Sequence, residues 1–196
     1  PRLQGGFVWD FVDQGLREVA DNGREYFAYG GDYGDEPNDG NFLINGLIFP
    51  DRRPSPGMIE YKKVLEPVLV EAVDLSLGQV KVTNRYDFLT LDHLVASWNI
   101  MADERIVQSG TLQLPSVAAG ETMETKVPFT PIALGTPGVK YWLNISFTLA
   151  SDTPWAPRGH EVAWSQFELP LSAPGPVVKV ADMPPLCVQE SNCTID

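Results

Sequence analysis

Seven short segments between residues 64 and 171 constrain the fold more than any other feature of the sequence. Each is rich in β-branched and aromatic residues, most alternate apolar with polar positions, and turn residues separate them. The segments are 68–73, 79–84, 93–100, 104–110, 124–129, 140–149 and 161–169. Regular short strands of this kind are typical of two packed antiparallel sheets. We therefore predict a mainly β fold with an immunoglobulin-like antiparallel β-sandwich, and we expect Trp98, Trp142 and Trp164 to lie in its core.

The first 63 residues have a different pattern. Residues 5–12 form one short apolar run, which predicts a buried strand. Residues 21–45 are rich in Gly, Asp, Asn and Tyr, which indicates a long loop, and loops of this length are usually functional. Ser55 and Pro56 then predict the N-cap and first position of a short helix. Because one strand and one loop cannot enclose a core, this part must pack against other structure.

Charge excludes some classes of partner. The chain has 26 acidic and 14 basic residues, for a formal net charge of −12, and half of this charge lies in residues 1–60. A nucleic-acid-binding surface needs a basic face, so we expect no nucleic-acid partner. There is no run of 18 apolar residues, so we also expect no membrane span. Residues 172–196 contain Pro174, Pro176, Pro184 and Pro185 and are predicted to be a linker or tail, in which Cys187 and Cys193 are free thiols or close a small disulfide.

Three sets of residues in the first 60 positions could carry chemistry. Asp10, Asp13, Asp32 and Asp35 are candidates for the paired carboxylates of a glycosidase, or they cap turns. A second set consists of oxygen donors that suit Na⁺, Mg²⁺ or Ca²⁺, or that form turns: Asn38, Asp39, Asn41 and Asn45. The third set is aromatic and either stacks on a sugar or forms a local hydrophobic cluster: Trp9, Tyr26, Phe27, Tyr29, Tyr33 and Phe42.

Several stretches resemble the family 2 glycoside hydrolases, specifically the large bacterial-type β-galactosidases. The resemblance is carried by residues 1–15 (PRLQGGFVWDFVDQG), 29–39 (YGGDYGDEPND), 41–49 (NFLINGLIF) and 52–56 (RRPSP), and further on by 82–88 and 94–98. It implies that residues 1–63 are the end of a catalytic (β/α)₈ barrel, with its last strand, an active-site loop and a short helix. It also implies that residues 64–171 are the immunoglobulin-like domain that follows the barrel, and that residues 172–196 are a linker.

The resemblance implies part of a retaining β-galactosidase, which hydrolyses terminal β-D-galactosides by a two-carboxylate mechanism. Both catalytic glutamates of the family lie before the counterpart of Pro1, so no catalytic residue is assigned and the chain alone is predicted to be inactive. Trp9 matches the aromatic floor of the galactose site. The Phe42 backbone carbonyl and the Asn45 side-chain oxygen match ligands of a sodium ion, and Asn45 also touches the sugar. Asn38 matches a residue near a magnesium site.

The expected partners are a β-galactoside and the remainder of the parent enzyme, which is expected to be a cytoplasmic homo-oligomer. A β-glucuronidase or β-mannosidase activity is disfavoured by residues 38–45, which have the galactosidase-type sequence. The alternative from another class is a non-catalytic β-sandwich that serves as a binding or interaction module.

Overall fold

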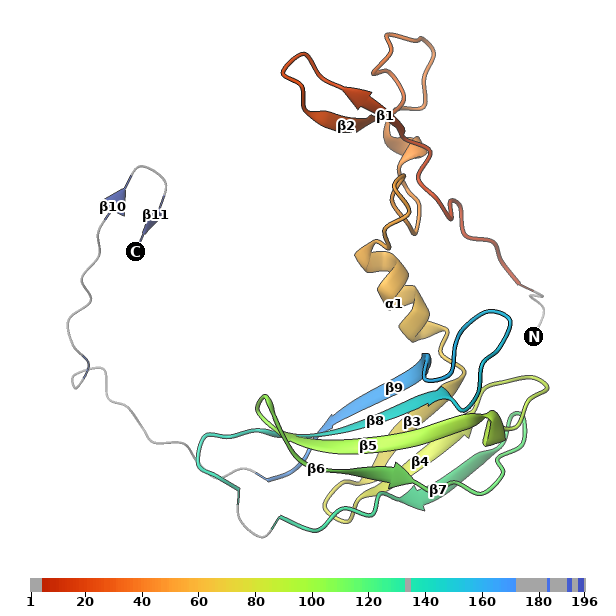
Figure 1. Cartoon of the computed structure of the whole chain (residues 1–196), viewed down its shortest axis with the longest axis vertical. Helices are drawn as coiled ribbons and strands as arrows, with labels where there is room; N and C mark the ends of the chain where they lie inside the picture. The colour runs from red at the N-terminus through yellow and green to blue at the C-terminus, as the bar shows by residue number, and fades with distance from the viewer. Residues whose placement is uncertain (1–4, 133–134, 172–182, 184–189, 192–193, 196) are drawn as a thin grey trace. The chain divides into compact units, whose positions relative to one another are not determined.

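The computed structural model describes residues 5–132, 135–171, 183, 190–191 and 194–195 (Figure 1). Contacts divide the chain into two compact units, Pro1–Glu66 and Pro67–Asp196. The only α-helix in the described residues belongs to the first unit, and all the longer strands belong to the second. No helix in the described part of the chain combines the length and the apolar character that a bilayer crossing needs.

The second unit is an antiparallel sandwich of two sheets (Figure 1). Its strands are β3 (Val68–Asp74), β4 (Gln79–Asn84), β5 (Leu94–Ala102), β6 (Arg105–Leu112), β7 (Thr122–Lys126), β8 (Tyr141–Leu149) and β9 (Glu161–Glu168). One sheet has the order β3-β4-β7 and the other β6-β5-β8-β9. These are the seven strands expected from the sequence, each within three residues at either end. The predicted antiparallel β-sandwich is therefore confirmed, while the immunoglobulin-like class remains a prediction.

The core lies between the two sheets and follows the alternation of each strand. Along β8 the buried residues are Tyr141, Leu143, Ile145, Phe147 and Leu149, and the residues between them are partly exposed. Strand β4 contributes Val80 and Val82 from the opposite sheet, both fully buried. Burial of branched and aromatic side chains at alternate positions is the main term that holds two such sheets together.

Only one of the three tryptophans expected in the core lies there. Trp98 is buried, and its indole packs over the backbone of Gly110 on the neighbouring strand β6. Trp142 shares its face of β8 with the outward residue Asn144, and Trp164 is 45% exposed. The prediction was wrong for Trp142 and Trp164. At even-numbered positions of β8 the other residues are polar, so the apolar odd-numbered positions turn inward and carry Trp142 outward.

A buried asparagine joins two loops at one end of the sandwich. Asn84 is fully buried; its Nδ2 donates to the carbonyls of Leu89 (2.8 Å) and Val117 (2.9 Å). Its Oδ1 accepts from the backbone N–H of Tyr86 (2.9 Å). None of these backbone groups is paired in a strand ladder. The Val117 carbonyl also accepts from Leu91 N (3.2 Å), whereas the Leu89 carbonyl and Tyr86 N–H have no other backbone partner in the described residues, so this side chain replaces their missing pairing.

The first unit contains a hairpin, a short 3₁₀ turn and one helix. The elements are β1 (Leu16–Val19), β2 (Glu25–Ala28), η1 (Gly40–Leu43) and α1 (Pro56–Val64), and β1 pairs antiparallel with β2. The helix begins as predicted: Ser55 is the N-cap, its Oγ accepts from Met58 N (3.3 Å), and Pro56 occupies the first position. The residues from 29 to 39 and from 44 to 55 contain no helix or strand.

Two predictions for this unit were wrong. Residues 5–12 form no regular strand, and only Val12 makes an isolated parallel bridge, to Ile48. A strand is stable only when it is hydrogen-bonded to neighbouring strands, and the described residues include no strand that pairs with residues 5–12. Strand β2 lies inside the stretch that was expected to be loop. The predicted linker at 172–196 and both cysteines lie outside the described residues, apart from residue 183 and a short antiparallel pair, β10 (Glu190–Ser191) and β11 (Thr194–Ile195).

Candidate functional site

Residues 10–14 and 43–48 lie side by side and close the long loop between them. Val12 and Ile48 form a parallel bridge at the centre of the contact. The backbone bonds are Leu47 N to Asp10 O (3.1 Å), Ile48 N to Phe11 O (3.0 Å), Asp13 N to Ile48 O (3.0 Å) and Gln14 N to Leu43 O (2.7 Å). This pairing fixes the segment that follows Trp9 against the segment that carries Phe42 and Asn45.

A carboxylate and a glycine make this pairing close. Asp13 Oδ1 accepts a hydrogen bond from Gly46 N at 2.7 Å, and bonds from an N–H to an ionised oxygen are among the stronger ones. A Cβ at position 46 would lie 2.4 Å from Asp13 N and 2.7 Å from the carbonyl carbon of Val12. Only glycine fits there without moving backbone. Asp13 therefore holds the loop in place, which favours the turn-capping alternative over a catalytic role for this residue.

An open hollow of about 460 Å³ lies beside this pairing, lined by Trp9, Gln14, Asp39, Phe42 and Leu43. The side chains of Trp9 and Phe42 are 80% and 73% exposed, so both rings are accessible. Exposed aromatic faces next to polar groups can stack on the apolar face of a sugar while the polar groups bind its hydroxyls. The Trp9–Asp10 peptide bond is cis, and Gln14 Nε2 donates to the Asp10 carboxylate.

The two expected sodium ligands lie three residues apart around the end of η1. Within the described residues the Phe42 carbonyl accepts no backbone hydrogen bond, and the Asn45 side chain makes no hydrogen bond. Asn45 is exposed but does not line the hollow. A peptide carbonyl and an amide oxygen are hard, neutral donors that suit Na⁺, so the donor chemistry fits that ion. No group of three or more His, Cys, Asp or Glu residues in the described chain could hold a metal ion.

Asn38 lies in the loop itself and is already engaged there. Its Nδ2 donates to the Asp35 carbonyl (2.9 Å), and its Oδ1 accepts from Gly40 N (3.0 Å). The amide also packs on Gly31, where a Cβ would lie 3.2 Å from Nδ2. Asn38 therefore shapes the loop, and its oxygen has one lone pair left for another partner.

Of the four site residues expected from the sequence, the structure brings Trp9 and Phe42 into one hollow and leaves Asn38 and Asn45 outside its lining. Sequence reasoning missed Gln14 and Leu43. Neither has a local signal, because only the pairing between residues 14 and 43 brings them next to Trp9.

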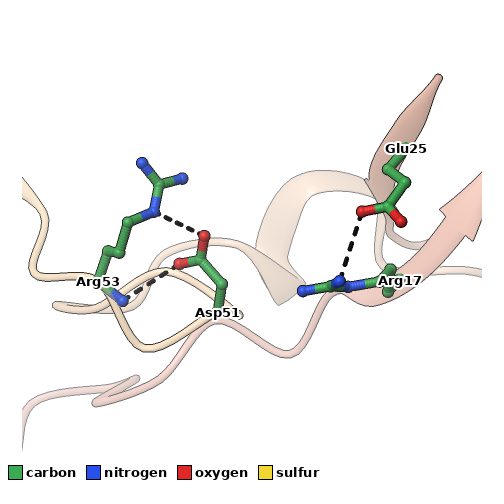
Figure 2. A network of polar contacts seen from close by, with 4 residues as sticks. All are labelled: Arg17, Glu25, Asp51 and Arg53. Atoms are coloured by element: carbon green, nitrogen blue, oxygen red, sulfur yellow. Dashed lines mark hydrogen bonds and ion pairs between the residues drawn. The ribbon is translucent and has the colours of Figure 1, made fainter.

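Ion pairs stabilise the exposed parts of this unit (Figure 2). Arg17 Nη1 lies 3.4 Å from Glu25 Oε2 across the β1–β2 hairpin. In the turn before α1, Arg53 donates to Asp51 through Nε (2.6 Å) and through its backbone N–H (3.1 Å). The hydrogen bond from the Arg53 side chain lowers the pKa of the Asp51 carboxyl below its ordinary value of 3.8. All these groups contact solvent, so each pair adds little stability.

Family models match both units of the chain. Residues 1–70 match the model described as glycosyl hydrolases family 2, TIM barrel domain. Residues 80–170 match the model described as β-galactosidase, domain 4. The two matches follow each other in the order expected from the sequence.

Curated β-galactosidases are similar over nearly the whole chain. The chain is 40% identical to a β-galactosidase of Priestia megaterium over 195 residues, which is 100% of this chain and 19% of that protein. It is 39% identical to one of Aeromonas hydrophila over 179 residues (91% and 17%) and 43% identical to one of Photobacterium profundum over 173 residues (86% and 16%). The chain spans less than a fifth of the length of these relatives. By these matches, the chain belongs to the family 2 glycosyl hydrolases.

Proposed function

We propose that the chain is part of a retaining β-galactosidase and supplies one wall of its galactose site. The observation that carries the proposal is the hollow in which Trp9 and Phe42 lie together, closed by the pairing of residues 10–14 with 43–48. The names of the curated relatives support the substrate class. In a retaining enzyme one carboxylate attacks the anomeric carbon and a second serves as acid and then base. Neither group is assigned to this chain, so we expect no turnover from these 196 residues alone.

In this proposal Trp9 supplies the aromatic floor against which the apolar face of galactose packs. The indole presents a large area of ring with one polar N–H, a combination suited to a ligand that is apolar on one face and polar at its edges. Asn45 binds a sugar hydroxyl through its amide. The hydrogen bond from Gly46 N to the Asp13 carboxylate fixes the backbone next to Asn45 and so orients the Asn45 side chain.

The Phe42 carbonyl and the Asn45 side-chain oxygen would hold Na⁺, with further ligands from outside the chain. A bound cation would supply a fixed positive charge that attracts a sugar hydroxyl oxygen. Asn38 is a weaker candidate for a magnesium site, because both ends of its amide already bond within the loop. The parent is proposed to be a cytoplasmic homo-oligomer.

Titration calorimetry with galactose tests the proposal on the 196-residue chain in Na⁺ and in K⁺ buffers. We expect binding that is tighter in Na⁺, is lost in Trp9→Ala, and loses its Na⁺ preference in Asn45→Ala. Trp155→Ala is the matched control, because Trp155 is also an exposed tryptophan (64%) but belongs to the second unit.

Two results would contradict the proposal. One is equal galactose binding by the native chain and by Trp9→Ala. The other is hydrolysis of a chromogenic galactoside by the purified chain at a rate that Trp9→Ala does not change, since catalysis would then need neither missing carboxylates nor this site.

A further inference from the structure

The outward face of the four-stranded sheet carries a row of side-chain amides. Asn144 Nδ2 donates to Asn99 Oδ1 (2.9 Å), and Gln166 Nε2 donates to Asn144 Oδ1 (2.8 Å). The three residues face one another in register on β5, β8 and β9, which lie side by side (Figure 1). The bonds run in one direction, so the row ends in the NH₂ group of Asn99 and the carbonyl oxygen of Gln166, which make no other hydrogen bond with the described residues.

Two tryptophans flank this row on the same face. Trp142 precedes Asn144 by two positions on β8, and Trp164 lies opposite Ser146, two positions beyond Asn144. At about 3.4 Å per strand residue, the two indoles are attached about 14 Å apart along the sheet, with the amide row between them. Lys140 Nζ lies 5.7 Å from the Trp142 ring centroid and 3.2 Å from a Glu168 oxygen, which fixes that indole and leaves its corner of the face neutral.

The outward positions of the two central strands carry no charged residue. The outward positions of the two central strands are Val95, Ser97, Asn99 and Met101 on β5, and Trp142, Asn144, Ser146 and Thr148 on β8. In a chain with 20% charged residues and a net charge of −12, a solvated sheet face should carry lysines and glutamates. The charged residues Glu161 and Glu168 lie beside them on the outer strand β9. Glu161 accepts a hydrogen bond from Ser146 Oγ (2.6 Å), and Glu168 pairs with Lys140.

We propose that this face, defined by Asn99, Asn144, Gln166, Trp142 and Trp164, binds a neutral polysaccharide chain. Sugar hydroxyls both donate and accept, so they complement amides that still have one free donor or acceptor at each end of the row. The C–H faces of the sugar rings pack on the indoles. The two central strands carry no charged residue, so they complement an uncharged polymer better than an acidic or basic one.

The shape of the face favours a chain over a single sugar. The face spans four adjacent strands and is open, so it can contact several residues of an extended polymer but encloses no terminal sugar. A protein partner is less favoured, because the centre of a stable protein interface is mainly apolar and the centre here consists of amides and hydroxyls. The site lies in the second unit, so it is independent of the galactose site proposed above.

Affinity electrophoresis of the 196-residue chain in native gels tests the proposal. The gels contain soluble β-1,4-galactan, hydroxyethylcellulose or dextran, three neutral polymers that differ in sugar and linkage. We expect at least one polymer to retard the native chain. Loss of one stacking ring or one amide should weaken binding roughly three- to tenfold in Trp142→Ala and Gln166→Ala.

Trp155→Ala and Trp9→Ala are the controls and should migrate as the native chain does. Gln166 is exposed, so Gln166→Ala remains informative if Trp142→Ala unfolds. Nuclear magnetic resonance then places the site: the side-chain amide signals of Asn99, Asn144 and Gln166 should shift with the retarding polymer. The proposal is overturned if no polymer retards the chain, if Gln166→Ala and Trp155→Ala bind equally, or if the shifts lie only in residues 5–66.

Discussion

Replacing Asn84 by alanine removes three hydrogen bonds from a fully buried position of the sandwich. The Leu89 carbonyl loses its donor and Tyr86 N–H loses its acceptor, while the Val117 carbonyl keeps a second donor, Leu91 N (3.2 Å). These groups lie in two loops that Asn84 joins, so no ladder bond can replace the lost partners.

The expected loss follows from these contacts. A buried backbone group left without a partner costs about 1–3 kcal/mol, and water that enters the space vacated by the amide recovers part of this. Two groups left without a partner, together with the lost bond to Val117, give about 2–4 kcal/mol, which is a large share of the 5–15 kcal/mol that typically stabilises a domain. Asn84→Asp keeps the shape and the acceptor but places a carboxylate oxygen against two carbonyl oxygens, so its loss should be at least as large.

Urea unfolding followed by far-UV circular dichroism measures this loss in the 196-residue chain. Thr83→Ala is the matched control on the same strand, because it removes one exposed bond, to Thr122 (3.0 Å), and should cost less than about 0.5 kcal/mol. A loss below about 1 kcal/mol in Asn84→Ala, or an Asn84→Asp variant as stable as the native chain, would refute the reasoning.

Three further outcomes are expected in the first unit. Gly46→Ala should abolish galactose binding, measured by calorimetry, because its Cβ would overlap backbone, whereas Gly6→Ala meets no atom within 4 Å and should bind normally. Ser55→Ala should destabilise α1 by about 1 kcal/mol, measured as faster amide hydrogen exchange in that helix. Carboxyl titration by nuclear magnetic resonance should give Asp51 a pKa below 3.8, and Arg53→Ala should raise it towards that value, because the side-chain bond is lost while the backbone N–H of residue 53 still donates. Since the folded pKa is lowered, this pair stabilises the fold above pH 3.8 and is lost as the pH falls through the folded value.

The sandwich could be predicted because its strands carry their own signal. In β8 the apolar residues Leu143, Ile145 and Phe147 alternate with polar ones, and the same parity defines the buried face. The alternation also predicts the outward face for Trp142, because Trp142 stands at a position where the other residues are polar. The prediction placed it in the core because an indole is large and mainly apolar. Parity decides the face of a strand, and residue type does not.

The first unit could be predicted less well because its order comes from exposed or distant contacts. In the β1–β2 hairpin, Ala28 is the only buried residue and an exposed pair, Arg17 with Glu25, crosses the strands, so no apolar alternation marks it. The helix start was predictable because the bond from Met58 N to the Ser55 hydroxyl spans only three residues.

Without the family resemblance, the contacts that build the candidate site could not be predicted from the sequence. The bond from Gly46 N to Asp13 spans 33 residues, and the bond from Gln14 N to Leu43 spans 29, so neither follows from a local pattern. Composition could only suggest that an aromatic, oxygen-rich loop binds a sugar or a cation. The two backbones approach so closely at position 46 that every residue with a Cβ is excluded, and their pairing places Trp9 and Phe42 beside one hollow. In the proposed galactose site, Gly46 and Asp13 would therefore act by positioning the loop without touching the ligand, and Gly46→Ala would separate this positioning role from the stacking contact proposed for Trp9.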